Sequence, residues 1–406
     1  MTLVETLGRA RPGDGVHVGG DRVEATYVVQ GVPDLEAAAH EIVVEESTGT
    51  DAAGAAVLSR VGGEIVDVEH AGVERLALEA PPLAREGVDS APVGRVTVAW
   101  PAENAASLPA LLTMVAGETT ERGAFGACRL VRLGIPADLL AACSGPRFGL
   151  DGTRKLLGVE TRPVIGAIVK PSTGLDPDAF ALVAASLAAG GCDFVKDDEL
   201  LMDPPHCPYA ERVPAVRAAL DAVEDRTGRR VAYAANATGP IETLGRRLDI
   251  AAEHDTAMVM LNAVVLGLDV LRSAATRAAV PLFAHRVMGG ILTRPAAVGV
   301  SPGVLCGLTR VAGADLVQVG GVAGKIFEDD ATIAASAEVC RRPLAQLAAA
   351  LPTSGGGQGL ATVAANASAF GDPGFCHLLG SVATDDPAGA TVAVRRVVEA
   401  WSEVVW

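Results

Sequence analysis

The chain has 406 residues, 50% of them hydrophobic but only 3% aromatic, so its core must be built mainly from Ala, Val and Leu. This length is sufficient for two domains. The formal net charge of -16 argues against binding to nucleic acid or to anionic membranes. No apolar run reaches the roughly 18 residues of a membrane span, and the N-terminus lacks a basic-then-apolar signal pattern. The 7 cysteines include no CxxC pair, which favours reduced thiols and a cytoplasmic protein.

The first part of the chain, residues 1–135, has the pattern of an α+β domain. Helices are predicted at 34–46 and 108–115, and strands at 22–29, 63–68, 75–80 and 94–100. This mixture favours a ferredoxin-like sheet. Residues 136–154 are the expected connection to a second domain, which we place at 136–406.

Apolar strands alternate with amphipathic helices in the second part of the chain. Helices are predicted at 178–189 and 213–226, and strands at 164–170, 192–196, 231–235, 257–265, 281–285, 316–319, 351–354 and 375–379. Strands and helices in this order predict a (β/α)8 TIM barrel followed by a C-terminal helix. A doubly wound sheet shows the same alternation. The barrel is favoured because polar residues stand at the ends of many strands, where barrel enzymes carry their chemistry.

The most informative segment is 190–199, with the sequence GGCDFVKDDE. Lys196 and Asp198 share a face, as alternate strand residues should, and Glu199 lies past the end of the strand. A lysine ammonium has only donors and cannot ligate a cation. If CO2 adds to the amine, however, the resulting carbamate and the two carboxylates form an oxygen-donor set that suits Mg2+. The alternative is a charged strand end that faces water.

This GGxDFxKDDE run resembles the metal-site strand of RuBisCO and RuBisCO-like proteins. The resemblance covers most of the chain, from about residue 22 to about residue 400. It implies an N-terminal α+β domain followed by a (β/α)8 barrel. It also implies that CO2 is bound as a carbamate on Lys196, and that Lys196, Asp198 and Glu199 hold Mg2+.

Three further motifs resemble parts of the family's catalytic machinery. Lys170 opens a KPSTGL run similar to the family's KPKxGL, whose first lysine moves protons. In the family's HR pair, matched by His285 and Arg286, the histidine lies near the reacting carbons and the arginine binds a substrate phosphate. Lys325 follows a glycine-rich stretch similar to a mobile loop whose lysine closes over the substrate. The plain alternatives are a surface lysine, a core histidine and an ordinary turn.

The phosphate loops of the family have partial counterparts. The run Ser354-Gly355-Gly356 resembles an SGG loop whose backbone N–H groups bind phosphate. Gly380 and Ser381 lie where RuBisCO has glycines for its second phosphate. The segment from Glu45 to Thr50, EESTGT, resembles a motif that completes the active site of a partner subunit. The resemblance therefore implies a homodimer or an assembly of dimers, and no small subunit is expected.

Four positions depart from the RuBisCO pattern, namely Ser172, Glu118, Gln318 and Leu379. These departures argue against carboxylation of a bisphosphate. The sequence therefore predicts a RuBisCO-like, Mg2+-dependent lyase or isomerase that forms an enediolate from a small phosphorylated keto sugar or keto sugar acid. The alternatives are a true ribulose-bisphosphate carboxylase, a methionine-salvage enolase and a non-catalytic binding protein.

Overall fold

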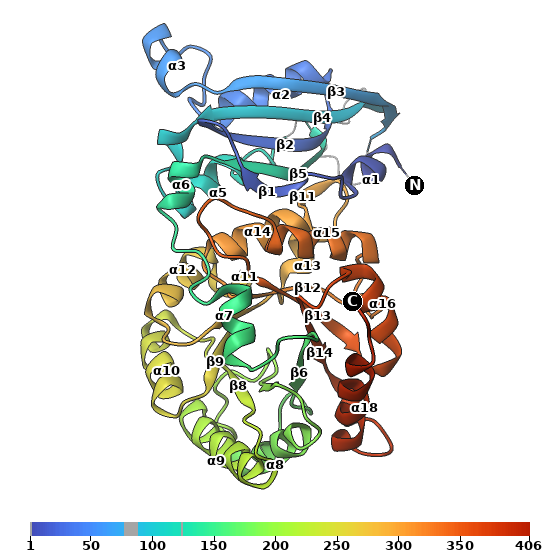
Figure 1. Ribbon diagram of the computed structural model, residues 1–406. Helices are drawn as coiled ribbons and strands as arrows, with labels where there is room; N and C mark the ends of the chain where they lie inside the picture. The colour runs from blue at the N-terminus through green and yellow to red at the C-terminus, as the bar shows by residue number, and fades with distance from the viewer. Residues whose placement is uncertain (1, 77–87, 123–124) are drawn as a thin grey trace. The chain divides into compact units, whose positions relative to one another are not determined.

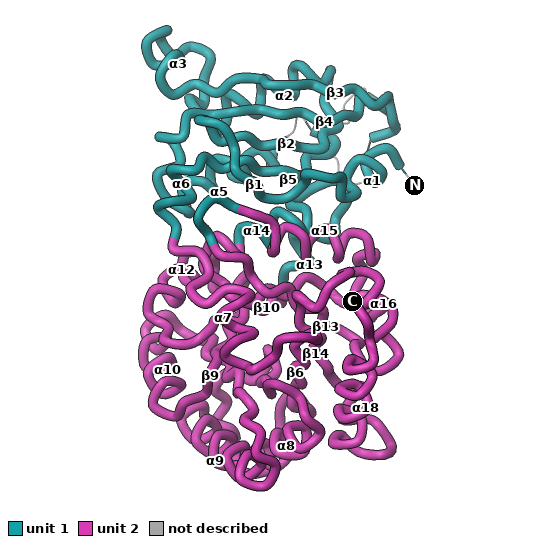
Figure 2. The backbone as a smooth tube through the Cα atoms, in the orientation of Figure 1, with its two compact units in different colours: residues 1–143, 288–308, 344–347 teal, residues 144–287, 309–343, 348–406 magenta. Residues whose placement is uncertain are grey.

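The computed structural model describes residues 2–76, 88–122 and 125–406. The chain divides into two compact units, shown in different colours in Figure 2. The first consists of residues 1–143, 288–308 and 344–347, and the second of residues 144–287, 309–343 and 348–406. The domain boundary expected after residue 135 coincides with the end of a strand. The first unit continues beyond it to Cys143 and takes in two later segments of the chain.

The first unit is built on a mixed sheet with the strand order β1-β5-β2-β4-β3, and β11 pairs with β5 (Figure 1). Its strands are β1 (Gly15–Val18), β2 (Arg22–Gly31), β3 (Glu64–Arg75), β4 (Ser90–Pro101), β5 (Phe125–Ile135) and β11 (Val298–Val300). Its helices are α1 (Leu3–Gly8), α2 (Leu35–Glu45), α3 (Ala55–Val61), η1 (Ala102–Ala105), α5 (Leu108–Ala116), α6 (Ala137–Ala141) and α13 (Gly289–Thr293). The succession β2-α2-β3-β4-α5-β5 is the ferredoxin-like βαββαβ pattern.

The sequence missed part of this sheet. The strands predicted at 63–68 and 75–80 correspond to a single long strand, β3, and residues 77–80 lie outside the described residues. Strand β5 was not predicted because Arg129 and Arg132 interrupt its apolar pattern. Arg129 is buried all the same, and its guanidinium donates to the carbonyl of Thr293 at 2.8 Å. Strand β11 is only 3 residues long, too short for a periodic pattern.

The second unit contains a closed parallel barrel with the strand order β6-β7-β8-β9-β10-β12-β13-β14. Its strands are β6 (Val164–Ile168), β7 (Phe194–Lys196), β8 (Ala232–Asn236), β9 (Ala257–Asn262), β10 (Leu282–His285), β12 (Leu316–Gly320), β13 (Leu351–Gln358) and β14 (Cys376–Leu379). Each corresponds to a predicted strand. The predicted fold class, an N-terminal α+β domain followed by a (β/α)8 barrel, is confirmed.

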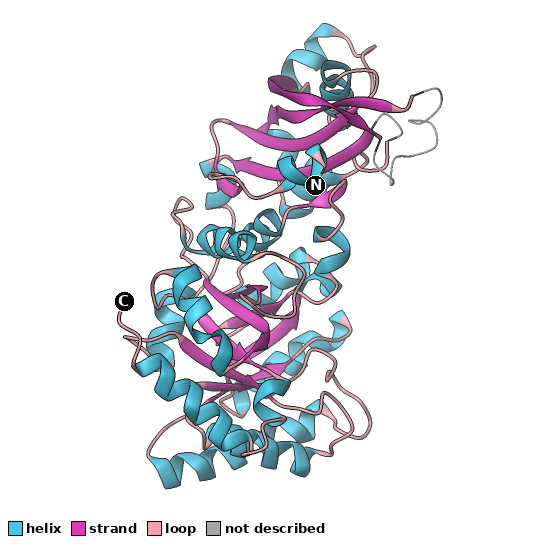
Figure 3. Ribbon diagram, turned by 90° about the vertical axis from the view of Figure 1, so that its right-hand side faces the viewer, coloured by secondary structure: helices cyan, strands magenta, loops and turns pink. Residues whose placement is uncertain are grey.

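Helices surround the barrel strands, as Figure 3 shows. They are α7 (Gly149–Leu156), α8 (Pro177–Ala188), α9 (Tyr209–Thr227), α10 (Ile241–Glu253), α11 (Ala263–Leu266), α12 (Leu268–Arg277), α15 (Asp330–Arg341), η2 (Leu360–Thr362), α16 (Val363–Phe370), α17 (Ser381–Thr384) and α18 (Ala390–Ser402). Helix α14 (Pro302–Val311) spans the boundary between the two units along the chain. Among the residues that the structure describes, no helix is both long and apolar enough to cross a membrane.

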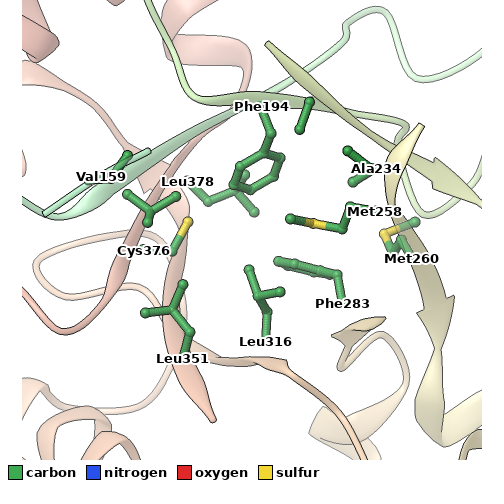
Figure 4. Close-up of a cluster of buried hydrophobic side chains, with 13 residues drawn as sticks. Val159, Phe194, Ala234, Met258, Met260, Phe283, Leu316, Leu351, Cys376 and Leu378 are labelled. Carbon is green, nitrogen blue, oxygen red and sulfur yellow. The ribbon is translucent and has the colours of Figure 1, made fainter. Parts of the chain in front are cut away.

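The barrel interior is filled by side chains that point toward one another from different strands (Figure 4). The rings of Phe194 and Phe283 lie 6.4 Å apart, and Leu316 and Leu351 belong to the same buried cluster. Gly166 makes room for Phe194, because a Cβ at this position would lie 2.3 Å from the ring. Since strand residues alternate in direction, the residue two places after Phe194 also faces inward, and that residue is Lys196.

Candidate active site

Lys196, at the end of β7, is completely buried. Its Nζ atom donates to the carbonyl of Asp197 at 2.6 Å, contacts Sδ of Met260 at 3.0 Å and lies 5.7 Å from the centre of the Phe283 ring. Burial lowers the pKa of Lys196, and nearby carboxylates offset only part of this effect. A lower pKa increases the fraction of neutral amine, which is the form that can react with CO2.

Asp197 and Asp198 point in opposite directions and have different partners. Asp197 is fully buried, and its carboxylate accepts from the Tyr233 hydroxyl at 2.5 Å, from the Asn236 N–H at 2.8 Å and from Arg212 Nε at 3.2 Å. A buried charge needs such compensation, and here it is supplied by α9 and β8. Asp197 therefore holds the barrel wall together, and Asp198 is left to face the mouth of the barrel.

Lys170, which follows β6, forms an ion pair with the Asp198 carboxylate and donates to Ser172 Oγ at 2.9 Å. The Leu200 N–H adds a second hydrogen bond to Asp198, at 3.1 Å. Burial alone would raise the pKa of Asp198, but the hydrogen bonds from Lys170 and Leu200 outweigh it and lower that pKa. Asp198 is therefore an anion, with the amine of Lys170 beside it.

The backbone at Glu199 is fixed by two asparagines at strand ends. Asn236 Nδ2 donates to the carbonyl of Glu199 at 3.3 Å, and Asn262 Nδ2 donates to the same oxygen at 3.0 Å. The side chain of Glu199 is about a quarter exposed, and its Oε2 lies 3.4 Å from His285 Nε2. The carboxylate is thus directed into the barrel mouth between β7 and β10.

His285 is a neutral imidazole in this arrangement. Burial lowers its pKa well below the ordinary value, and the positive charges of Lys196, Arg286 and Lys170 lower it further. The Val287 N–H donates to His285 Nδ1 at 3.1 Å, so we assign the ring proton to Nε2, the atom that faces Glu199. His285 can therefore donate a hydrogen bond into the site without carrying a charge.

Arg286 lies beside this histidine, but its guanidinium is already engaged within the protein. It forms an ion pair with Glu328 and donates to the carbonyl of Val319 at 3.1 Å. The Arg286 side chain is 15% exposed and that of Glu328 is 2% exposed. The role expected for Arg286, binding a substrate phosphate, stays a prediction.

The glycine-rich segment after β12 packs against the end of β13. A Cβ at Gly321 would lie 2.7 Å from the carbonyl oxygen of Gly356, and a Cβ at Gly324 would lie 2.2 Å from it. The Lys325 N–H donates to that same oxygen at 3.1 Å, while the Lys325 side chain is exposed. The Val322 N–H donates to Ser354 Oγ at 3.3 Å. Two predicted segments, the lysine loop and the SGG loop, are thus in direct contact.

The end of β13 departs from regular pairing with β14. The register runs from Gly355 opposite Leu378 directly to Gln358 opposite Leu379, so Gly356 and Gly357 bulge out of the ladder. Both glycines have positive φ angles, 108° and 79°. Gly380 and Ser381 come immediately after Leu379 at the same end of the barrel.

Glu45 and Thr50 belong to the first unit. The Glu45 carboxylate lies 3.3 Å from Arg122 Nη1. Neighbouring Glu46 accepts from the Thr119 N–H at 2.7 Å, and Thr50 Oγ1 accepts from the Ala52 N–H at 3.1 Å. The proposed role of this segment in a partner's active site stays a prediction.

The residues at the barrel mouth fit the metal site that the sequence implies. Among the described residues, no group of three or more His, Cys, Asp or Glu side chains is placed to hold a metal ion. The implied site needs only two such residues, Asp198 and Glu199, because a carbamate on Lys196 would be the third ligand. The buried amine of Lys196 and the two carboxylates at the strand end supply these groups.

Comparison with known proteins decides the family. Residues 149–405 match the catalytic domain of the ribulose bisphosphate carboxylase large chain. The chain belongs to the RuBisCO large-chain family. This family generally uses Mg2+ and a carbamylated lysine. The RuBisCO-like protein predicted from the sequence motifs is thereby confirmed.

Individual relatives are similar over nearly their whole length. A protein of Xanthobacter autotrophicus named 3-oxo-isoapionate-4-phosphate transcarboxylase/hydrolase is 34% identical, over 94% of this chain and 93% of its own. A 3-oxo-isoapionate-4-phosphate decarboxylase of Rhizobium etli is 32% identical, over 94% and 93%. The crystal structure of a rubisco-like protein from Burkholderia fungorum superimposes with a TM-score of 0.88 at 31% identity, covering 94% of both chains. These names agree with the predicted class, an enzyme that is RuBisCO-like but not a carboxylase.

Sequence reasoning missed two residues of the site. Glu328, the partner of Arg286, lies 42 positions away along the chain, and no spacing rule links the two. Asn262 was also missed, although it ends β9 and the rule that barrel chemistry lies at strand ends would have been sufficient to find it.

Proposed function

We propose that the barrel is a Mg2+-dependent site that forms an enediolate from a phosphorylated keto sugar acid, most simply by decarboxylating a 3-oxo acid. The observation that carries the proposal is the ion pair between Lys170 and Asp198 beside the buried amine of Lys196. It places a proton-transferring group directly next to the implied metal ligands. When bound, Mg2+ would act as a Lewis acid toward the substrate's carbonyl oxygen.

In decarboxylation of a 3-oxo acid, the bond between the carboxylate carbon and the adjacent carbon breaks and CO2 leaves. The electron pair of that bond moves toward the carbonyl, which gives an enolate, and an enediolate when the carbon that loses CO2 carries a hydroxyl group, as in a sugar acid. A proton must then be delivered to the carbon that lost CO2. Lys170 can supply this proton as an ammonium, because its Nζ atom is bound to the Asp198 carboxylate, one of the implied metal ligands. In an isomerisation, the same amine would remove a proton and return it to the neighbouring carbon.

His285 has a second role in this proposal. Its imidazole is neutral, and its Nε2–H faces the site. A neutral donor can stabilise negative charge that develops on a substrate oxygen without forming a fixed ion pair in the ground state. Glu199 Oε2 lies 3.4 Å from this nitrogen, so the two side chains face the same part of the site.

The phosphate of the substrate is assigned to the end of β13. Gly356 and Gly357 lie outside the regular strand ladder, which frees their backbone to face an anion. Ser354, Gly355, Gly380 and Ser381 complete this side of the barrel mouth, and Lys325 stands in the loop packed against it. The relatives named for a 3-oxo acid monophosphate support a substrate with one phosphate.

The experiment is a CO2-release assay on a panel of phosphorylated 3-oxo sugar acids, with Mg2+ and bicarbonate present. Wild type should release CO2 from at least one of them, and Lys170→Gln should lose at least about a hundredfold in rate, the usual range for a general acid. Lys155→Gln, at an exposed position of helix α7, is the matched surface control. Release that persists in Lys170→Gln, or formation of 3-phosphoglycerate from ribulose bisphosphate, would contradict the proposal.

A further inference from the structure

The ion pair between Arg286 and Glu328 has a consequence for substrate choice. Arg286 follows β10, and Glu328 lies in the loop between β12 and α15. The loop is docked, because the Val322 N–H donates to Ser354 Oγ at 3.3 Å and the Ala323 N–H donates to Asp330 Oδ1 at 2.8 Å. Glu328 is therefore held against Arg286 by a loop with contacts at several points.

The ion pair between Arg286 and Glu328 carries no net charge. The Glu328 side chain is 2% exposed, so water screens its charge very little. Its carboxylate cancels the charge of the guanidinium. A phosphate that approached Arg286 would meet this buried anion as well as the cation, so repulsion from one would offset attraction to the other. Gln318, in the adjacent strand β12, is a neutral amide and adds no positive charge.

One oxygen of the pair also lacks a partner. Glu328 Oε1 binds Arg286, but Glu328 Oε2 is buried and receives no hydrogen bond from the described residues. A buried acceptor of this kind calls for a donor, because an unmade hydrogen bond is costly. A phosphate dianion has only acceptors and cannot meet this need.

We propose that Glu328 is a specificity residue that neutralises Arg286, removes the net attraction for phosphate at the β10–β12 end of the barrel and leaves that end to an uncharged part of the substrate. The inference rests on the proposed function, which puts the single phosphate at the end of β13. It gives a physical reason why a bisphosphate has no advantage over a monophosphate in this site.

The test compares the binding of ribulose 5-phosphate and ribulose 1,5-bisphosphate by calorimetry, on the full chain with Mg2+ and bicarbonate. Wild type should bind the two compounds with Kd values within about threefold of each other, since the second phosphate gains no net contact. Glu328→Gln should bind the bisphosphate at least about tenfold more tightly than wild type does, because the charge of Arg286 is then no longer cancelled by a carboxylate. Binding of the monophosphate should change little.

Two further variants complete the test. Glu338→Gln removes one negative charge from the exposed face of α15, where Glu338 is 61% exposed, and should behave as wild type does. If Glu328→Gln does not fold, the double variant Arg286→Gln with Glu328→Gln replaces it. This double variant should keep the wild-type ratio of the two Kd values, since Arg286 contributes no net binding free energy for phosphate in wild type.

The proposal is overturned if Glu328→Gln binds the bisphosphate no more tightly than wild type, absence of binding included. It is equally overturned if wild type has a lower Kd for the bisphosphate than for the monophosphate and the double variant loses this difference. Neither readout requires turnover. A failure of the CO2-release assay would therefore count against the proposed function alone.

Discussion

Lys170 and Asp198 form an ion pair that joins the ends of the adjacent strands β6 and β7. The next residue toward the N-terminus, Asp197, points the other way and is tied to Arg212 and Tyr233. The two neighbouring aspartates therefore have different surroundings: Asp197 is bound within the barrel wall, and Asp198 lies at the barrel mouth, where we propose that it serves the chemistry.

Conservative substitutions should separate these tasks. Asp197→Asn leaves the buried guanidinium of Arg212 without its counter-ion and should cost about 3–5 kcal/mol of unfolding free energy. Asp198→Asn should cost little stability, because Lys170 is a quarter exposed and water can solvate it. Mg2+ affinity should nevertheless fall at least about tenfold. Urea unfolding and metal-binding calorimetry measure the two effects, and equal stability losses in both variants would refute this division.

Lys196 should be carbamylated when CO2 and Mg2+ are present. The amine is fully buried and its pKa is lowered, so the reactive neutral form is accessible. Incubation with 13C-bicarbonate should give a carbamate signal in the NMR spectrum that is missing from Lys196→Met. The same variant should lose Mg2+ binding. Mg2+ that binds tightly to protein with an unmodified Lys196 would be the contrary result.

His377 in β14 should make stability depend on pH. Trp401 Nε1 donates to its Nδ1 at 2.7 Å, and burial lowers the pKa of His377 to about 3. An unfolded histidine titrates near 6.5, so the unfolded state binds more protons below that pH. The contribution of neutral His377 to the unfolding free energy is complete above about pH 6.5 and is lost as the pH falls toward 3.

Between pH 7 and pH 5 this group alone should account for a loss on the order of 2 kcal/mol. His377→Gln removes the titration but keeps a polar side chain. Its unfolding free energy should therefore fall less than that of wild type over this range, by about the same amount. Parallel pH profiles of the two proteins would show that His377 is not the cause.

The segment from Glu45 to Thr50 should act on the barrel of a partner subunit, as its resemblance to the family motif implies. If so, Glu45→Gln and Lys196→Ala are each inactive as homodimers. Mixed subunits would contain one intact site per dimer and should recover up to about a quarter of wild-type activity for random pairing. An active monomer, measured by light scattering together with the assay, would rule out a shared site.

The sequence was sufficient for the barrel because the alternation of strands and helices leaves few topologies open. All eight barrel strands lie where the apolar runs predicted them. The shared face of Lys196 and Asp198 was predicted from the two-residue period of a strand. Their roles as metal ligands were implied by the resemblance to the family and stay predictions. The pair of Arg286 and Glu328 did not, because it depends on how a loop folds back, and local pattern carries no such information. The burial of Arg129 in β5 was not predicted for a related reason, because the carbonyl groups that Arg129 binds are remote in sequence.

The central claim is that Lys170 moves a proton at an enediolate-forming, Mg2+-dependent site. The most direct measurement is deuterium incorporation, by mass spectrometry, into a phosphorylated keto sugar acid or its product in D2O. We predict one deuterium at the reacting carbon with wild type, lost on removal of Mg2+ with EDTA and lost in Lys170→Gln. Incorporation that is independent of Lys170 and Mg2+, or its absence from every substrate while ribulose bisphosphate is carboxylated, would contradict the account.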